Sequence, residues 1–318
     1  MTQLGQILPL ESTDGPGRGG RIYAVRSAYG LNFDVHADRG LDIGWASHAG
    51  QPLAWHSPRG FPVGSFAENE GYGWGRSFGG GLLTTCGMAS IGLPSIDEGE
   101  AFGLHGRVSS IPAQEVICRA TWESDDYVLE ISGRVIETTL GGPTLELHRT
   151  IRTIVGLPAV EITDVVTNLG PGPSPIMMRH HINLGFPLVQ PGDRIRANGS
   201  DPIARDRHRP EIDGWDGIDQ VSPTHREEVY ALCPELDNNQ AQVILAAADS
   251  SPKVVIDWDG RTMPQLLVWK HQQHGMNVLA LEPSTHGDHG RADARQRGSL
   301  NEVNPGQSIS FRTRIRCR

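Results

Sequence analysis

The chain has 318 residues and a formal net charge of −9, with no basic run and no interleaving of basic and aromatic residues. This excludes the usual electrostatic footprint of a nucleic-acid-binding protein and fits a soluble protein with a small polar ligand. No stretch approaches the roughly 18 apolar residues of a membrane span, and the first residues lack the pattern of a signal peptide. Four widely spaced cysteines predict a reduced, cytoplasmic protein without a cysteine-built metal site.

Short runs with the alternation of β-strands follow one another along the chain, separated by many glycines and prolines. The first begins at Arg21, and three consecutive runs begin at Tyr127, Thr144 and Ala159. Apolar and polar residues alternate in them at nearly period two, which predicts strands with one buried face. Five more such runs come later in the chain: QVILAAA, KVVIDWD, QLLVWKH, NVLALEP and SISFRTRIR.

Helical periodicity is scarce, and only short helices near residues 65–70 and 226–230 are expected. The polar stretch 189–222 is too long for a hairpin loop and is expected to be a functional or lid-like loop. Many closely spaced strands with few helices predict an all-β fold, a large antiparallel sandwich or barrel. No interdomain linker is visible, so residues 1–318 are expected to form one domain with its ligand on a sheet face.

Four stretches concentrate polar side chains in strand-like surroundings, and Glu282 stands out among them. It ends an apolar strand and precedes a proline. A carboxyl group among apolar neighbours tends to have a raised pKa and can act as a general base, whereas the alternative is a strand-end glutamate that faces water. The four stretches are FDVHADRGLDIGWA, GLHGRVS, MMRHHINLGFP and VLALEPSTH.

His180 and His181 are adjacent on a predicted strand, so their side chains point to opposite faces of the sheet. Only one of them can share a pocket with other groups on one face. A buried structural histidine is the alternative for either residue, and the sequence does not decide which of the two faces the ligand.

His105 and Arg107 are two residues apart in a glycine-bracketed segment. If the segment is extended, both side chains point to the same side and suit an oxygen-rich ligand. The alternative is a solvated loop. For Arg39, which lies close to Asp42, the alternative to ligand binding is a structural salt bridge.

A metal site and a phosphate loop are both disfavoured by spacing. The set of His105, His180 or His181, His286 and Glu282 would supply nitrogen and oxygen ligands, but no H-x-H or H-E-x-x-H motif supports it. The glycine-rich segment 75–87 lacks a G-K-S/T ending. No metal and no cofactor are therefore expected.

Five motifs in this order, DRGLDIG, SFGGGLLTTCG, GLHGR, HHINLGFP and ALEPSTH, resemble the DUF4432-type branch of the aldose 1-epimerase (galactose mutarotase-like) superfamily. The resemblance runs from about Arg21 to Arg316. It implies a large twisted antiparallel β-supersandwich with the site on a concave sheet face.

The resemblance also implies the site residues. The superfamily uses a glutamate near the C-terminus as general base and a histidine on a central strand as general acid, and Glu282 and His181 match these positions. The superfamily's further carboxylate has no clear counterpart, although Asp213, Asp216 and Asp219 lie in about the right region. The implied substrate-binding residues are His105, Arg107, Arg39, Asn183 and His180.

The leading hypothesis is a mutarotase that interconverts the anomers of a free sugar, with Glu282 ionised and His181 as the proton donor. Three cationic groups, Arg39, Arg107 and Arg179, make an acidic sugar worth testing. A metal-assisted sugar isomerase, epimerase or lyase and a non-catalytic sugar-binding protein are the alternatives. The expected partner is the sugar, without nucleic acid or membrane, and a homodimer formed by exposed strand edges is compatible with the sequence.

Overall fold

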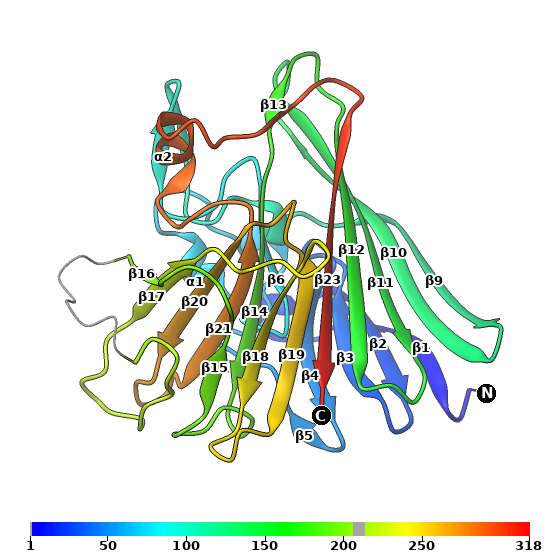
Figure 1. The fold of residues 1–318 in the computed structure, drawn as a ribbon. Helices are drawn as coiled ribbons and strands as arrows, with labels where there is room; N and C mark the ends of the chain where they lie inside the picture. The colour runs from blue at the N-terminus through cyan, green and yellow to red at the C-terminus, as the bar shows by residue number, and fades with distance from the viewer. Residues whose placement is uncertain (1, 206–213) are drawn as a thin grey trace.

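The computed structural model describes residues 2–205 and 214–318, which form two large layers of antiparallel β-strands (Figure 1). The first layer begins with a five-stranded sheet in chain order. Its strands are β1 (Gly5–Glu11), β2 (Arg21–Ser27), β3 (Leu31–His36), β4 (Asp42–His48) and β5 (Gln51–Pro52).

A six-stranded sheet continues this layer. Ile43 of β4 and Leu83 exchange two backbone hydrogen bonds of 3.1 and 3.0 Å, which join the two sheets edge to edge. The strand order across the second sheet is β16 (Ile203–Ala204), β17 (Glu228–Leu232), β20 (Gln265–His271), β21 (Val278–Ser284), β14 (Met177–Gly185) and β6 (Thr84–Met88).

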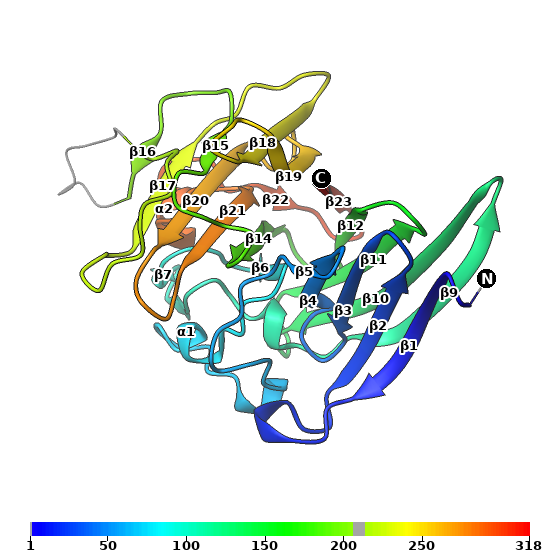
Figure 2. The same ribbon diagram turned by 90° about the horizontal axis from the view of Figure 1, so that it is seen from below.

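The opposing layer is an eight-stranded sheet, and Figure 2 shows its strands β9–β12 lying behind β1–β4. The three consecutive runs expected from the sequence are its neighbouring strands β10, β11 and β12. The order is β15 (Arg194–Arg196), β18 (Gln240–Ala246), β19 (Pro252–Asp259), β23 (Ser308–Cys317), β12 (Ala159–Asn168), β11 (Thr144–Ile154), β10 (Asp126–Thr138) and β9 (Gln114–Glu123).

The remaining elements are short. Two small two-stranded sheets and two helices complete the described structure, and the helix α2 sits above β20 and β21 in Figure 1. They are β7 (Ser95–Asp97) with β8 (Glu100–Phe102), β13 (Ser174–Pro175) with β22 (Glu302–Val303), α1 (Trp74–Ser77) and α2 (Gly290–Gln296).

The core lies between the two layers because successive side chains of each strand alternate between faces. On β11, Leu147 and Ile151 are buried against the first layer, whose strand β14 contributes Met178 and Ile182. The predicted all-β supersandwich is confirmed in this arrangement.

A polar network crosses this core and fixes where one of the candidate histidines points. Arg149 of β11 makes a two-pronged ion pair with Asp164 of β12, at 2.8 and 2.6 Å. His180 of β14 lies 2.9 Å from the same carboxylate through Nε2 and 2.8 Å from the Thr313 hydroxyl through Nδ1. Burial alone would raise the pKa of Asp164, but the adjacent Arg149 guanidinium holds it well below its usual range.

The outer face of the six-stranded sheet is also covered, which explains why all nine residues of β14 and all seven of β21 are buried. The covering segment runs between β5 and β9 and carries Trp55, Trp74 and Phe78, which form a second apolar cluster with Met177 and Val278. The space left between this segment and the sheet is the candidate site.

One local expectation was wrong, and another was only partly right. Residues 226–230 do not form a helix, because β17 begins at Glu228 and pairs along β20. The stretch 189–222 contains the strands β15 and β16, so it is not wholly loop, and its residues 206–213 lie outside the described part of the chain. Within residues 2–205 and 214–318, no helix is long and apolar enough to cross a membrane.

Candidate active site

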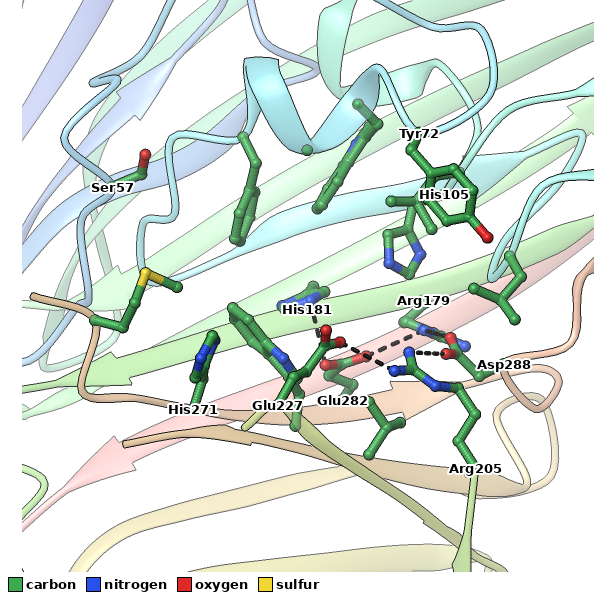
Figure 3. A pocket seen from close by; sticks show the side chains of 18 of the residues that line it. Ser57, Tyr72, His105, Arg179, His181, Arg205, Glu227, His271, Glu282 and Asp288 are labelled. Atoms are coloured by element: carbon green, nitrogen blue, oxygen red, sulfur yellow. Dashed lines mark hydrogen bonds and ion pairs between the residues drawn. The ribbon is translucent and has the colours of Figure 1, made fainter. Parts of the chain in front are cut away.

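A cavity of about 590 Å³ lies on the outer face of the six-stranded sheet (Figure 3). Its floor comes from β14, β20 and β21, and its roof from the segment that carries the helix α1. The volume falls within the range of about 300–1,000 Å³ that is typical of small-molecule sites.

Strand register brings the proposed acid–base pair together on this floor. Arg179 and His181 are two residues apart on β14 and so share one face. Ile182 pairs with Leu281 of β21, which places His181 opposite Glu282. The distance from His181 Nε2 to Glu282 Oε1 is 3.2 Å, and both side chains are buried.

Burial sets the protonation of this pair. It raises the pKa of Glu282 to about 8, against the opposing charge of Arg179. Burial also lowers the pKa of His181 well below its ordinary value, with His105 and Arg179 acting in the same direction. At neutral pH these shifts favour one proton on the pair, mainly on Glu282, whereas the carboxyl was expected to be ionised.

Carboxyl groups and arginines alternate along one wall of the cavity, as the dashed lines in Figure 3 show. Arg179 Nη1 lies 3.2 Å from Glu282 and 2.8 Å from Asp288. Arg205 continues this alternation, 3.1 Å from Asp288 and 3.3 Å from Glu227. Burial would raise the pKa of Asp288, but the nearby Arg179 outweighs it and holds this pKa at about 2.

His105 enters the cavity from the roof. Its backbone has φ = 59°, a left-handed conformation that is uncommon for residues other than glycine, and two backbone hydrogen bonds, to Gly92 and from Gly87, hold it. Its Nδ1 accepts a hydrogen bond of 3.3 Å from the Gly92 amide, which leaves Nε2–H facing the cavity. Burial lowers its pKa to about 3, so the ring is neutral.

Aromatic side chains provide the apolar part of the wall. Trp74 stacks on Phe78 at a ring distance of 4.5 Å, and both rings, with Trp269, approach His181 within about 6 Å. Flat apolar surfaces next to hydrogen-bonding groups suit the C–H faces and hydroxyls of a sugar.

The sequence-predicted residues divide into two groups. Glu282, His181 and His105 meet in the cavity. Arg107 does not line it: the left-handed turn at His105 breaks the extended spacing, and Arg107, 47% exposed, pairs with Glu137 at 3.2 Å.

The other predicted binding residues are also outside the cavity lining. His180 belongs to the core network, on the face of β14 opposite His181. The amide of Asn183 donates to the backbone carbonyls of Gly81 and His181, at 2.9 and 3.0 Å, and so supports the strand beside His181. Arg39 lines a different cavity.

Three charged cavity residues were missed by sequence reasoning: Asp288, Arg205 and Glu227. Asp288 lies two residues beyond the ALEPSTH motif, and this proximity is the one signal that could have identified it. Of the three earlier candidates for a further carboxylate, Asp216 pairs with Arg194 at 3.3 Å, Asp219 does not line the cavity, and Asp213 lies outside the described residues.

The metal set considered from the sequence is not assembled. His286 Nδ1 lies 2.7 Å from the Thr285 hydroxyl and Nε2 lies 2.9 Å from the Ser299 carbonyl. Among the residues that the structure describes, His, Cys, Asp and Glu side chains form no group of three or more that could hold a metal ion.

Comparison with known proteins agrees with this fold. The family DUF4432, described as a domain of unknown function, matches residues 17–317. A provisionally assigned aldose 1-epimerase from Klebsiella pneumoniae is 21% identical, with 99% of this chain and 88% of that chain covered and a TM-score of 0.89. The galactose 1-epimerase of Lactobacillus acidophilus is 11% identical, with 98% of both chains covered and a TM-score of 0.60. A comparison with curated proteins finds no match.

Proposed function

Since the chain belongs to the DUF4432 family, whose description assigns no function, we propose from its cavity that it is a carbohydrate epimerase, an aldose 1-epimerase that interconverts the anomers of a free sugar. The observation that carries this proposal is the contact of 3.2 Å between His181 and Glu282 in a cavity walled by aromatic rings. A site that only binds sugar has no need of two buried groups that share a proton.

Ring opening requires one proton to leave the anomeric hydroxyl and one to reach the ring oxygen. With the proton on Glu282, neutral His181 accepts the proton of the hydroxyl while Glu282 protonates the ring oxygen, whose bond to C1 breaks. The aldehyde rotates about the C1–C2 bond and the ring closes on its other face. Both protons then return along the same routes, so each residue acts once as acid and once as base.

The pair also works from the opposite starting state, with Glu282 ionised and His181 protonated, which is the order that the resemblance implies. The two states differ only by a proton transfer across 3.2 Å. The raised pKa of Glu282 and the lowered pKa of His181 favour the first state.

The remaining polar groups of the cavity suit hydroxyl recognition. Nε2–H of His105 is a donor above the floor, and Asp288 is a carboxylate that accepts from sugar hydroxyls, the part expected of the superfamily's further carboxylate. Arg179 lies next to Glu282 and stabilises negative charge that develops on a sugar oxygen.

The charges favour a neutral sugar over an acidic one. Of the three arginines that suggested an acidic substrate, only Arg179 lines the cavity, and it is already paired with Glu282 and Asp288. Arg205 is paired with Asp288 and Glu227. A carboxylate or sulfonate on the sugar would have to compete with these internal ion pairs.

The test is anomer exchange of α-glucose and α-galactose, monitored by one-dimensional NMR, with glucuronate as the acidic comparison. We expect the wild type to exceed the buffer rate on a neutral sugar. Glu282→Gln keeps the shape of the side chain and should reduce the enzymatic rate by about 10²- to 10⁴-fold, because it removes one partner of the proton exchange.

Glu227→Gln is the matched control, since it makes the same change in the same cavity at a residue whose ion pair is with Arg205. A new sugar in the spectra, in place of exchanged anomers, would move the assignment to an isomerase, epimerase or lyase. Sugar binding without turnover by the wild type, retained in Glu282→Gln, would identify a non-catalytic binding protein.

A further inference from the structure

A second cavity, of about 280 Å³, lies beside the five-stranded sheet and contains Arg39, the motif arginine that the active-site cavity does not use. Its wall is formed by the end of β3, the turn after this strand, and the segments 12–22 and 59–63. The volume is below the range of about 300–1,000 Å³ for drug-sized ligands, so the cavity suits a small molecule.

Arg39 is buried in the base of this cavity with most of its hydrogen-bonding capacity unused. The residue is 4% exposed, and the one hydrogen bond of its guanidinium among the described residues runs from Nη1 to the Pro62 carbonyl, at 2.9 Å. A guanidinium carries five N–H donors, so several remain for a ligand. A buried cation with free donors in a cavity is the arrangement that binds an oxyanion in two-pronged geometry.

Asp42, the carboxylate whose charge acts on Arg39, makes no hydrogen bond to it among the described residues. Oδ1 of Asp42 accepts from the amide and hydroxyl of Thr85, at 3.0 and 2.6 Å, and from Arg149 at 3.2 Å. Asp42 therefore attracts Arg39 through space, while its own hydrogen bonds belong to the core network. No carboxylate of the described residues hydrogen-bonds to the Arg39 guanidinium. An anion that enters the cavity can therefore bind Arg39 without displacing one.

The other groups of the wall limit the charge and the kind of ligand. His36 stacks on Phe61 at 4.4 Å, and burial together with the charge of Arg39 lowers its pKa to about 3, so its ring is a neutral polar surface. Asp38 is engaged by Arg21, and Asp14 accepts a hydrogen bond from Gly15. These two carboxylates disfavour a dianion but accept hydrogen bonds from hydroxyl groups.

We propose that this second cavity is a binding site for a small hydroxycarboxylate, whose carboxylate lies on Arg39 and whose hydroxyl groups face Asp14 and Asp38. The site is separate from the active-site cavity. Segment 57–61 forms part of both walls, with Ser57 and Pro58 facing the active site and Arg59 to Phe61 facing the second cavity.

The test is isothermal titration of the full chain with D-glycerate, and with glycerol and inorganic phosphate as comparisons. We expect saturable binding of glycerate and none of glycerol. Arg39→Met and Arg39→Lys should each weaken glycerate binding by about tenfold or more, because one loses the charge and the other loses the planar fork. Arg39→Lys keeps the buried positive charge and serves if Arg39→Met does not fold.

The matched control is Arg194→Met, which removes an exposed arginine on β15 and should leave glycerate binding unchanged. Glu282→Gln should also leave it unchanged, since it alters the other cavity. The proposal is overturned if the wild type binds no glycerate, if both Arg39 variants bind it normally, or if Glu282→Gln abolishes binding. Phosphate that binds more tightly than glycerate and depends on Arg39 would overturn the choice of a carboxylate.

Discussion

Replacing Glu282 by glutamine should stabilise the protein, and increasingly so as the pH rises. The carboxyl is fully buried, and burial raises its pKa from an ordinary value of 4.5 to about 8. Below pH 4.5 the carboxyl is protonated in both the folded and the unfolded chain, so it does not change the free energy of unfolding with pH. Between 4.5 and 8 the unfolded chain loses this proton and the folded chain keeps it, so the free energy of unfolding falls as the pH rises.

The two pKa values determine the size of the effect. From pH 5 to pH 8, a carboxyl group with these values lowers the free energy of unfolding by about 3 to 4 kcal/mol. Glutamine does not ionise, so the variant does not lose this stability. The other titrating groups contribute nearly equally to the free energy of unfolding of the two proteins, and their contributions largely cancel in the difference. The stability of Glu282→Gln relative to the wild type should therefore rise by about 3 to 4 kcal/mol over this interval.

Urea unfolding at pH 5, 6, 7 and 8 measures this difference. Glu227→Gln is the control: the side chain of Glu227 is 46% exposed, so its relative stability should change by less than about 1 kcal/mol over the same range. A change of less than about 1 kcal/mol for Glu282→Gln as well would refute the reasoning, because it would mean that burial imposes no cost on the ionised carboxyl.

Three further outcomes are expected. The kcat/KM for anomer exchange should stay level from mildly acidic pH and fall above about pH 8, where Glu282 loses the shared proton; a pH–rate profile that already falls below pH 7 would contradict this. His180→Asn should cost about 1 to 3 kcal/mol in urea unfolding while KM for the sugar stays within about threefold, because it disrupts the core network and not the cavity. Arg107→Ala should change kcat/KM by less than about threefold and stability by no more than about 1 kcal/mol, and a large kinetic loss would return Arg107 to the site.

The strands were predictable because alternation is a local property. The runs that begin at Tyr127, Thr144 and Ala159 became β10, β11 and β12, whose inward residues form the core. The helix predicted at residues 226–230 was wrong because so short a segment shows little periodicity. The conformation from Glu228 onward is set by pairing with β20.

Cavity residues could be predicted from the sequence only where a single strand or a single motif identifies them. Glu282 and His181 lie on central strands, and their motifs identify them. Arg205 and Glu227 lie next to the short strands β16 and β17, and nothing in their immediate sequence distinguishes them from surface charges. The spacing of His105 and Arg107 failed because the argument assumed an extended backbone, whereas the left-handed conformation of His105 turns the chain and directs Arg107 away from the cavity.

The adjacent histidines of β14 have different surroundings: His180 belongs to the core network, and His181 lines the cavity. His180 has both ring nitrogens within hydrogen-bonding distance of core groups, whereas His181 has Glu282 within reach on one side and no hydrogen-bond partner for Nδ1 among the described residues. A buried ring that is only partly satisfied costs stability, and such a cost is expected where a group must exchange protons with a ligand. The sequence shows that the two rings face opposite ways, but the packing of the second layer against β14 determines which of them faces the cavity.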